Sequence, residues 1–203
     1  HRDLHRVERR QRQMCIRDRT ALGIPVDERD DDFYLEATIE SVSRMIDNHT
    51  GRRFYAETDT RYYAPISIDE VYTDDIISVT SLKTDDDNDG TFETTWSASD
   101  YHLMPFNAGE NGRPYTWIEA SGYGSYSFPH GTKKAVQIVG SFGYATTAPK
   151  PVAEACKIQA IRLFKRKDAP FGVIAGGDMQ QSMTIPDLDP DVKMLLSPYV
   201  RRV

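Results

Sequence analysis

One acidic motif in the sequence has the residue types and the spacing of a cation site. Asp85, Asp87 and Asp89 alternate and precede Gly90, as in a calcium-binding loop, where alternate carboxylates converge on a hard cation. A complete EF-hand loop has a bidentate glutamate at its twelfth position, and here that position is Trp96. We therefore interpret the segment as an acidic hairpin turn and expect no metal site.

The other residues with reactive or ligating side chains do not form a recognisable site. His49, His102 and His130 are not at metal-ligand spacing from one another. His49 continues an apolar helical stripe, which predicts a half-buried packing role. Cys156 lies within an apolar helical segment, where an inert hydrophobe is expected rather than a nucleophile. We expect no catalytic residue and no cofactor, and the protein is not expected to be an enzyme.

Charge is distributed unevenly along the 203 residues. The formal net charge is −6, but residues 1–19 contain seven Arg and only three acidic residues, so the rest of the chain carries −10. A basic arm that binds nucleic acid is one interpretation. However, the string RQRQMCIRDR resembles translated sequencing-adaptor read-through, and we expect residues 1–19 to be non-native and disordered. The acidic remainder is unsuited to gripping phosphates by bulk charge.

The composition also bears on the cellular compartment. No run of eighteen apolar residues is present, which predicts no membrane-spanning helix. No apolar segment with a small-residue cleavage site opens the chain, so we expect no secretion. Cys15 and Cys156 cannot form a disulfide framework. These features favour a reducing compartment such as a bacterial cytoplasm.

The first predicted element is a helix over residues 33–50. Leu35, Ile39, Val42 and Ile46 recur at spacings of three and four and form one apolar stripe. An acidic run at residues 30–32 provides an N-cap, and Gly51 follows where a C-cap glycine is expected.

The period then changes from 3.6 to 2, which predicts an antiparallel β region of about five or six strands. In one segment, Ile77 and Val79 are expected on the same side; in another, Phe92, Thr94 and Trp96 share a face. The candidate strands cover residues 60–63, 76–84, 91–96, 101–104, 115–119 and 134–139.

Helix returns near the C-terminus. A long helix is predicted over residues 151–167, followed by a flexible loop at 168–187 that is rich in Gly, Pro and Gln. Asp189 and Pro190 then open a short C-terminal helix as N-cap and N1. The order predicts an α+β fold, which we expect to form a single domain over residues 20–203.

Several segments resemble the head–tail connector (adaptor) proteins of tailed bacteriophages. Residues 39–54, IESVSRMIDNHTGRRF, resemble the opening helix of that family and its Thr-Gly-Arg corner. The β region is similar at residues 78–83, at the acidic turn ending in Gly90, and at residues 100–105. Residues 142–165 and 189–196 complete the likeness, which covers about residues 22–203.

This resemblance implies a structural virion protein. Such proteins form a ring, usually of twelve copies, beneath the portal protein at the head–tail junction, and double-stranded DNA passes through the bore without sequence-specific binding. A tail-proximal stopper or tail-completion protein is the other expected partner, and assembly is expected in the bacterial cytoplasm. We expect the subunit or portal interface to include Ile158, Ile161, Leu195, Leu196, Tyr199 and Arg201.

The alternative interpretation is a secreted or surface β-rich binding module. Calcium in the acidic turn would support it, with exposed aromatic side chains as the contact surface. Its candidate residues are Tyr115, Trp117, Tyr123 and Tyr126.

Deleting residues 1–19 is expected to leave folding unchanged, because this stretch has no apolar stripe that could dock on a core. Thermal unfolding of the shortened and full-length chains measures the effect. A fall in melting temperature of more than a few degrees would show that the arm is structural.

Overall fold

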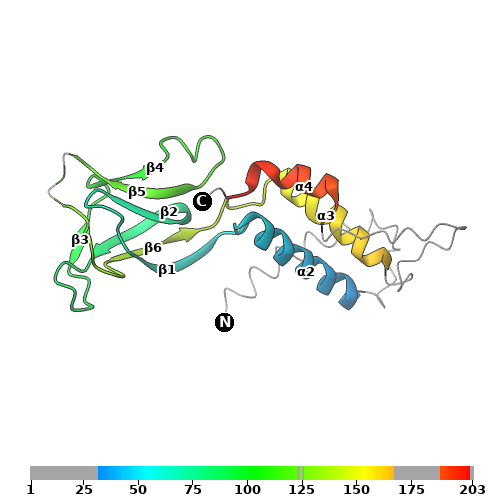
Figure 1. Ribbon diagram of the computed structural model, residues 1–203, viewed down its shortest axis with the longest axis horizontal. Helices are drawn as coiled ribbons and strands as arrows, with labels where there is room; N and C mark the ends of the chain where they lie inside the picture. The colour runs from blue at the N-terminus through cyan, green and yellow to red at the C-terminus, as the bar shows by residue number, and fades with distance from the viewer. Residues whose placement is uncertain (1–31, 123, 125, 167–187, 202–203) are drawn as a thin grey trace, which may run out of the picture. The chain divides into compact units, whose positions relative to one another are not determined.

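The computed structural model describes residues 32–122, 124, 126–166 and 188–201 (Figure 1). The chain divides into two compact units. We call the unit containing residues up to 51 and from 149 the helical unit, and the unit of residues 52–148 the β unit. The α+β fold class is confirmed. Predictions for residues 1–19 and 168–187 lie outside the described residues, and that of one domain over 20–203 stays a prediction.

The first described element of the helical unit is α2 (Asp32–Thr50). Its predicted apolar stripe is confirmed, because Leu35, Ile39, Val42 and Ile46 are all buried. Gly51 ends the helix at a φ of +65°, and its N–H donates to the carbonyl oxygen of Asp47. This is the left-handed C-cap that glycine adopts without strain.

The stripe of α2 ends at Thr50 and not, as predicted, at His49. His49 is exposed, whereas Thr50 is only 1% exposed. At 3.6 residues per turn, His49 and Thr50 lie on the two sides of the stripe, and the core contact is on the Thr50 side. The hydroxyl of Thr50 donates to the carbonyl oxygen of Ile46, which satisfies the buried polar group.

The described residues of the helical unit include three more helical segments: α3 (Lys150–Lys165), α4 (Pro190–Leu196) and the short 3-10 turn η2 (Ser197–Tyr199). The two long helices, α2 and α3, pack against each other. The hydroxyl of Ser43 lies 3.7 Å from the thiol of Cys156. The rings of Tyr34 and Phe164 are 5.7 Å apart. None of the helices in the described residues is long and apolar enough to cross a membrane.

The β unit is a six-stranded sheet whose neighbouring strands all pair antiparallel. The order is β1-β6-β2-β5-β4, and β3 pairs with β2 beside this path. The strands are β1 (Glu57–Tyr63), β2 (Glu70–Thr84), β3 (Thr94–Trp96), β4 (Tyr101–Met104), β5 (Tyr115–Ala120) and β6 (Val136–Phe142). The predicted strand at 101–104 has these bounds, whereas the one at 91–96 is shorter in the structure.

β2 is longer than predicted, and its alternation differs. Its register against β6 shifts between Ile76 and Ser78 and again between Val79 and Ser81. Each shift inserts an extra residue, so strict alternation is lost. As a result Ile76, and not Ile77, is the fully buried residue at this point. Ile77 and Val79, which were predicted to share a side, are both half-buried and flank the exposed Ser78, whereas the fully buried position belongs to Ile76.

The core of the β unit lies within the curled sheet and contains stacked aromatic rings. Trp96 stacks on Phe128 with ring centroids 4.5 Å apart, and its indole N–H donates to the buried hydroxyl of Thr84. The nine fully packed members of this core are Val71, Ile76, Leu82, Trp96, Ile118, Phe128, Val136, Ile138 and Phe142. Phe92 lies before β3 and instead contacts the ring of Tyr62.

One buried ion pair joins the start of the β unit to its longest strand. Arg52 donates through Nη1 to Oδ1 of Asp75 at 2.5 Å, and Asp75 is only 5% exposed. The guanidinium of Arg52 also lies 5.5 Å from the ring centroid of Tyr144. An unpaired carboxylate at this depth would strongly destabilise the fold, and Arg52 provides the positive charge that Asp75 needs.

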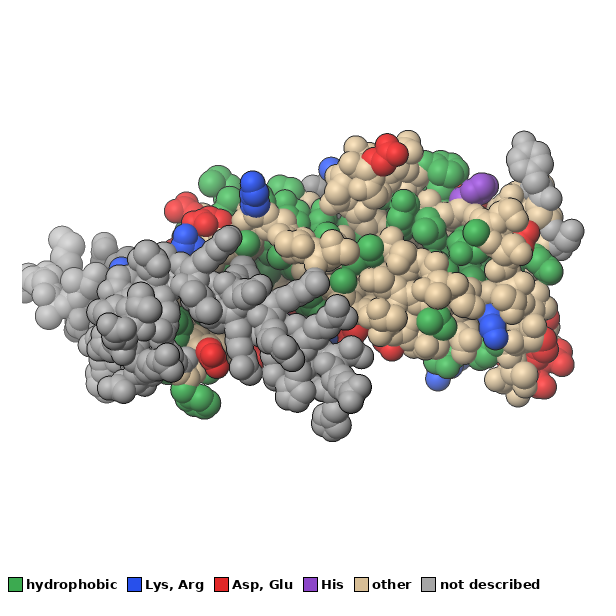
Figure 2. Space-filling model, turned by 180° about the vertical axis from the view of Figure 1, so that it is seen from behind, with side chains coloured by type: hydrophobic (Ala, Val, Ile, Leu, Met, Phe, Trp, Pro, Cys, Tyr) green, Lys and Arg blue, Asp and Glu red, His purple; other side chains and the backbone are tan. Residues whose placement is uncertain are grey.

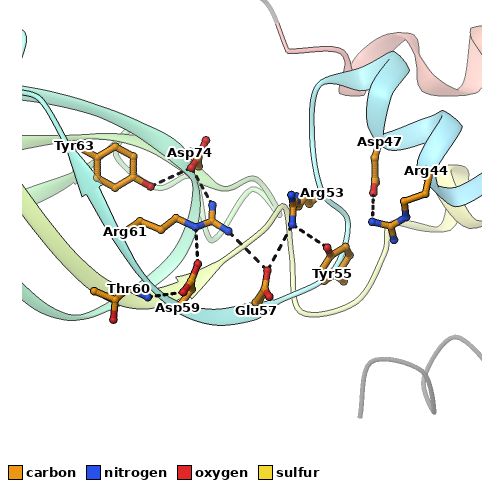
Figure 3. A network of polar contacts seen from close by, with 10 residues as sticks. All are labelled: Arg44, Asp47, Arg53, Tyr55, Glu57, Asp59, Thr60, Arg61, Tyr63 and Asp74. Carbon is orange, nitrogen blue, oxygen red and sulfur yellow. Dashed lines mark hydrogen bonds and ion pairs between the residues drawn. The ribbon is translucent and has the colours of Figure 1, made fainter. Parts of the chain in front are cut away.

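The edge strand β1 carries a network of charged side chains (Figure 3). Arg61 contacts Asp59 at 3.3 Å and Asp74 at 2.9 Å, and its guanidinium lies 4.3 Å from the ring centroid of Phe142. Burial acts to lower the pKa of Arg61, but these carboxylates outweigh it and raise that pKa. The pKa of the Tyr63 hydroxyl is raised by burial and by the charge of Asp74, to which it donates. The network therefore holds the guanidinium of Arg61 charged and the hydroxyl of Tyr63 protonated at neutral pH.

Gly140→Ala is expected to destabilise the β unit. A Cβ at position 140 would lie 2.3 Å from the carbonyl oxygen of Ser78, a backbone atom. Overpacking of this kind costs about 1–3 kcal/mol. Urea unfolding measures the loss, with Gly122→Ala as the control because nothing lies within 4 Å of its Cβ. Equal stabilities of the two variants would show that β6 can move away from β2 without cost.

Candidate assembly interface

The outer face of α3 presents two of the predicted interface residues. The opposite side of the helix is buried within the helical unit. Its buried residues are Val152, Ala155, Cys156, Gln159, Ala160 and Phe164. With 3.6 residues per turn, Ile158 and Ile161 flank the direction of the exposed side chain of Glu154, away from that buried stripe. Both isoleucines are half-buried. They are therefore partly accessible aliphatic side chains on the side of α3 opposite its buried stripe.

α4 divides the two predicted leucines between different environments. Leu195 is half-buried, as an interface residue could be. Leu196 is 0% exposed and shares the buried side of the helix with Val192, four residues earlier. Leu196 therefore belongs to the core of the helical unit, and its inclusion in the interface is corrected. Met194 is the apolar residue of α4 that is most exposed, at 69%, and the sequence reasoning missed it.

α4 is held on α3 by polar contacts around its N-cap. The carboxylate of Asp189 accepts from the N–H of Asp191 and forms an ion pair with Arg162 at 2.6 Å. The side-chain oxygen of Gln159, which is 1% exposed, accepts from the N–H of Asp189. These polar contacts fix the N-terminus of the short helix, in addition to the burial of Val192 and Leu196.

The last two predicted interface residues follow α4. Tyr199 and Arg201 are both half-buried. The N–H of Arg201 donates to the carbonyl oxygen of Thr50 at 2.8 Å. The cationic residue therefore lies at the C-terminus of α2, where the helix dipole favours positive charge.

The acidic turn between β2 and β3 brings four carboxylates together. Oxygen atoms of Asp85, Asp87, Asp89 and Glu93 lie within 4.8 Å of one another. Figure 2 shows acidic side chains gathered at the end of the β unit where this turn lies. The sequence reasoning missed Glu93, although its position just after the turn is the signal that a hairpin would fold it back.

Backbone N–H groups already occupy several oxygens of these carboxylates. Asp85 accepts from the N–H groups of Asn88 and Gly90, and Asp89 accepts from the N–H of Thr91. Hydrogen bonds from the side chain and the backbone of Thr91 lower the pKa of Asp89. The arrangement is that of a self-satisfied acidic turn, as the sequence predicted.

The cysteine, the histidines and the exposed aromatic residues that the sequence singled out lie in different environments. Cys156 is buried, as expected for a packing residue. His102 and His130 are exposed. Of the aromatic residues named for a binding module, Tyr126 is 42% exposed, but Tyr115 packs against the core of the β unit, and Tyr123 lies outside the described residues.

Calcium is expected not to stabilise the protein appreciably, because the carboxylates of the turn are engaged by its own backbone. A single site at one hundred times its dissociation constant would add about 2.7 kcal/mol. Thermal unfolding with and without calcium measures this, and Asp87→Ala is the matched control. A clear shift that Asp87→Ala abolishes would establish a calcium site.

No protein-family model matches the chain, and no curated protein is significantly similar to it. Solved structures do share its fold. A chain in the virion of a native gene transfer agent (GTA) particle matches with a TM-score of 0.58, covering 93% of this chain and 90% of that chain at 18% identity.

Two further matches come from the neck of such particles. A chain in the neck of an empty GTA particle, computed with C6 symmetry, has a TM-score of 0.56 with the same coverage and identity. A chain in the neck of a native GTA particle, computed with C12 symmetry, has a TM-score of 0.51, covers 84% of each chain and is 18% identical. The protein therefore has the fold of a chain found in the neck of gene transfer agent particles.

Proposed function

We propose that the protein is a structural virion component that forms a ring, of twelve copies when assembled, between the portal and the tail. The observation that carries this proposal is the shared fold with a neck chain over 93% of the sequence. The necks containing the similar chains were computed with C6 and C12 symmetry. Sixfold and twelvefold symmetry are those of closed rings, in which each subunit contacts the next by a heterologous interface.

The charge of the protein suits a channel for DNA. Residues 52–148 contain 14 Asp and Glu against 7 Lys and Arg. A surface of this sign repels the phosphate backbone, so double-stranded DNA would slide through the bore during packaging and ejection without sequence-specific binding. The proposed partners are the portal above and a stopper or tail-completion protein below.

The proposed role needs no catalysis and no cofactor. Two of the described candidates for chemistry have structural surroundings. Cys156 is buried in the helical unit, and the acidic turn is satisfied by its own N–H groups. These surroundings support a structural role. The protein is proposed to assemble in the bacterial cytoplasm and to lie at the head–tail junction, because the similar chains are found in the neck of their particles.

Assembly with the portal tests this proposal. The full-length protein is mixed with the portal protein encoded in the same genome and analysed by native mass spectrometry and electron microscopy. We expect a stoichiometric ring on the portal. A folded sample that forms no complex with its own portal would overturn the connector assignment.

Ile161→Asp is expected to block ring assembly while leaving the subunit folded. Ile161 lies on the outer face of α3 and is half-buried, so a carboxylate there remains hydrated in the subunit but not in a subunit contact. Circular dichroism reports folding and native mass spectrometry reports assembly. Val152→Asp is the control, because Val152 is 4% exposed and its replacement is expected to unfold the helical unit. Unfolding by Ile161→Asp would place Ile161 in the core instead.

A further inference from the structure

One face of the β unit displays a charged row beside an aromatic row. Along three adjacent strands, Val71, Ile118 and Leu103 are in register and belong to or pack against the core. Because side chains alternate along a strand, the rows on either side of this one point outward. The first outward row is Glu70, Glu119 and His102, and the second is Tyr72, Trp117 and Met104. We call these six residues the sheet face.

The charged row contains two adjacent carboxylates with no cation paired to them among the described residues. Glu70 and Glu119 are directly opposite each other on β2 and β5, and like charges in this arrangement destabilise a strand pair. Among the described residues, neither carboxylate forms an ion pair. The neighbouring His102 contacts the ring of Phe106 at 5.6 Å. A cation from outside the β unit would relieve this repulsion.

The aromatic row supplies apolar surface next to these carboxylates. The rings of Tyr72 and Trp117 are 6.0 Å apart, and Tyr72 is 51% exposed. Phe106, just beyond β4, is 60% exposed. Figure 2 shows hydrophobic side chains interrupting the polar surface of the β unit. Carboxylates beside exposed aromatic rings suit a ligand with ammonium groups and aliphatic carbon.

The outer face of α3 has that chemistry. Residues 150, 154, 157, 158, 161 and 165 recur at helical spacing along a helix about 24 Å long. They include Lys150, Lys157 and Lys165 against one acidic residue, Glu154. Ile158 and Ile161 lie between the lysines and are half-buried. The face therefore combines net positive charge with an aliphatic centre.

We propose that the sheet face of one copy binds the outer face of α3 of the next copy around the ring. Lysines of the helix meet Glu70 and Glu119, and the isoleucines lie on Tyr72 and Trp117. The two surfaces differ, so the contact is heterologous and can repeat until the ring closes. This proposal rests on the proposed ring function and names the surfaces that form its subunit contact.

Charge exchange tests the contact in the full-length protein. The sheet variant carries Glu70→Lys and Glu119→Lys, and the helix variant carries Lys157→Glu and Lys165→Glu. Each variant alone opposes like charges at every contact, so we expect at least a tenfold loss of ring on the portal, measured by native mass spectrometry. An equimolar mixture restores complementary charges at every contact. It should form rings in which the two variants alternate in equal numbers.

The control places the same charge change elsewhere on the β unit. Asp87→Lys with Glu93→Lys alters two exposed carboxylates of the acidic turn and should leave ring formation unchanged. Circular dichroism verifies that each variant is folded. Normal assembly of a folded sheet variant, or failure of the mixture to assemble, overturns the proposed contact while the ring function stands. Failure of the folded wild-type protein to form any ring overturns both.

A second measurement does not depend on charge reversal. Tyr72→Cys and Ile161→Cys in one chain should form disulfides between neighbouring copies when the assembled ring is oxidised. A ladder of multimers on a non-reducing gel is the expected result. Tyr126→Cys with Ile161→Cys is the control, because Tyr126 lies outside the sheet face. An assembled ring in which the first pair gives no more multimers than the control overturns the contact.

Discussion

The β unit depends on the close approach of β6 to β2. At Gly140 the two backbones are so near that a Cβ would overlap the carbonyl oxygen of Ser78. β1 pairs with the other side of β6, whereas β5 and β3 pair with β2. The whole sheet is therefore assembled outward from this one pair, and its curvature follows from the two bulges that β2 makes against β6.

Local sequence patterns predicted the elements whose structure is determined locally. In α2 the apolar stripe and the glycine cap were both recognisable, because helical period and positive φ leave a direct signature. The first six residues of β2 were missed because they include Asp74 and Asp75, which read as a turn. Asp75 is tolerated in a buried strand only through its ion pair with Arg52, 23 residues earlier, and no local pattern contains that information.

The sequence predicted only in part which of the candidate interface residues are accessible. Amphipathic spacing places Ile158 and Ile161 opposite the buried side of α3. It cannot separate Leu195 from Leu196, because in a seven-residue helix the direction of the core is set by the contact with α3. Glu70, Glu119 and His102 are spread over 50 residues of sequence, and only the strand register brings them into one row.

The charge network on β1 has a consequence for the behaviour of free subunits. β1 is a terminal strand of the sheet, and such a strand can recruit the edge of another molecule and start aggregation. The three carboxylates of Glu57, Asp59 and Asp74 lie around two cations, Arg61 and Arg53, which leaves this border with an excess of negative charge. Two such borders repel each other. Unassembled subunits at high concentration would thus resist aggregation through their edge strands.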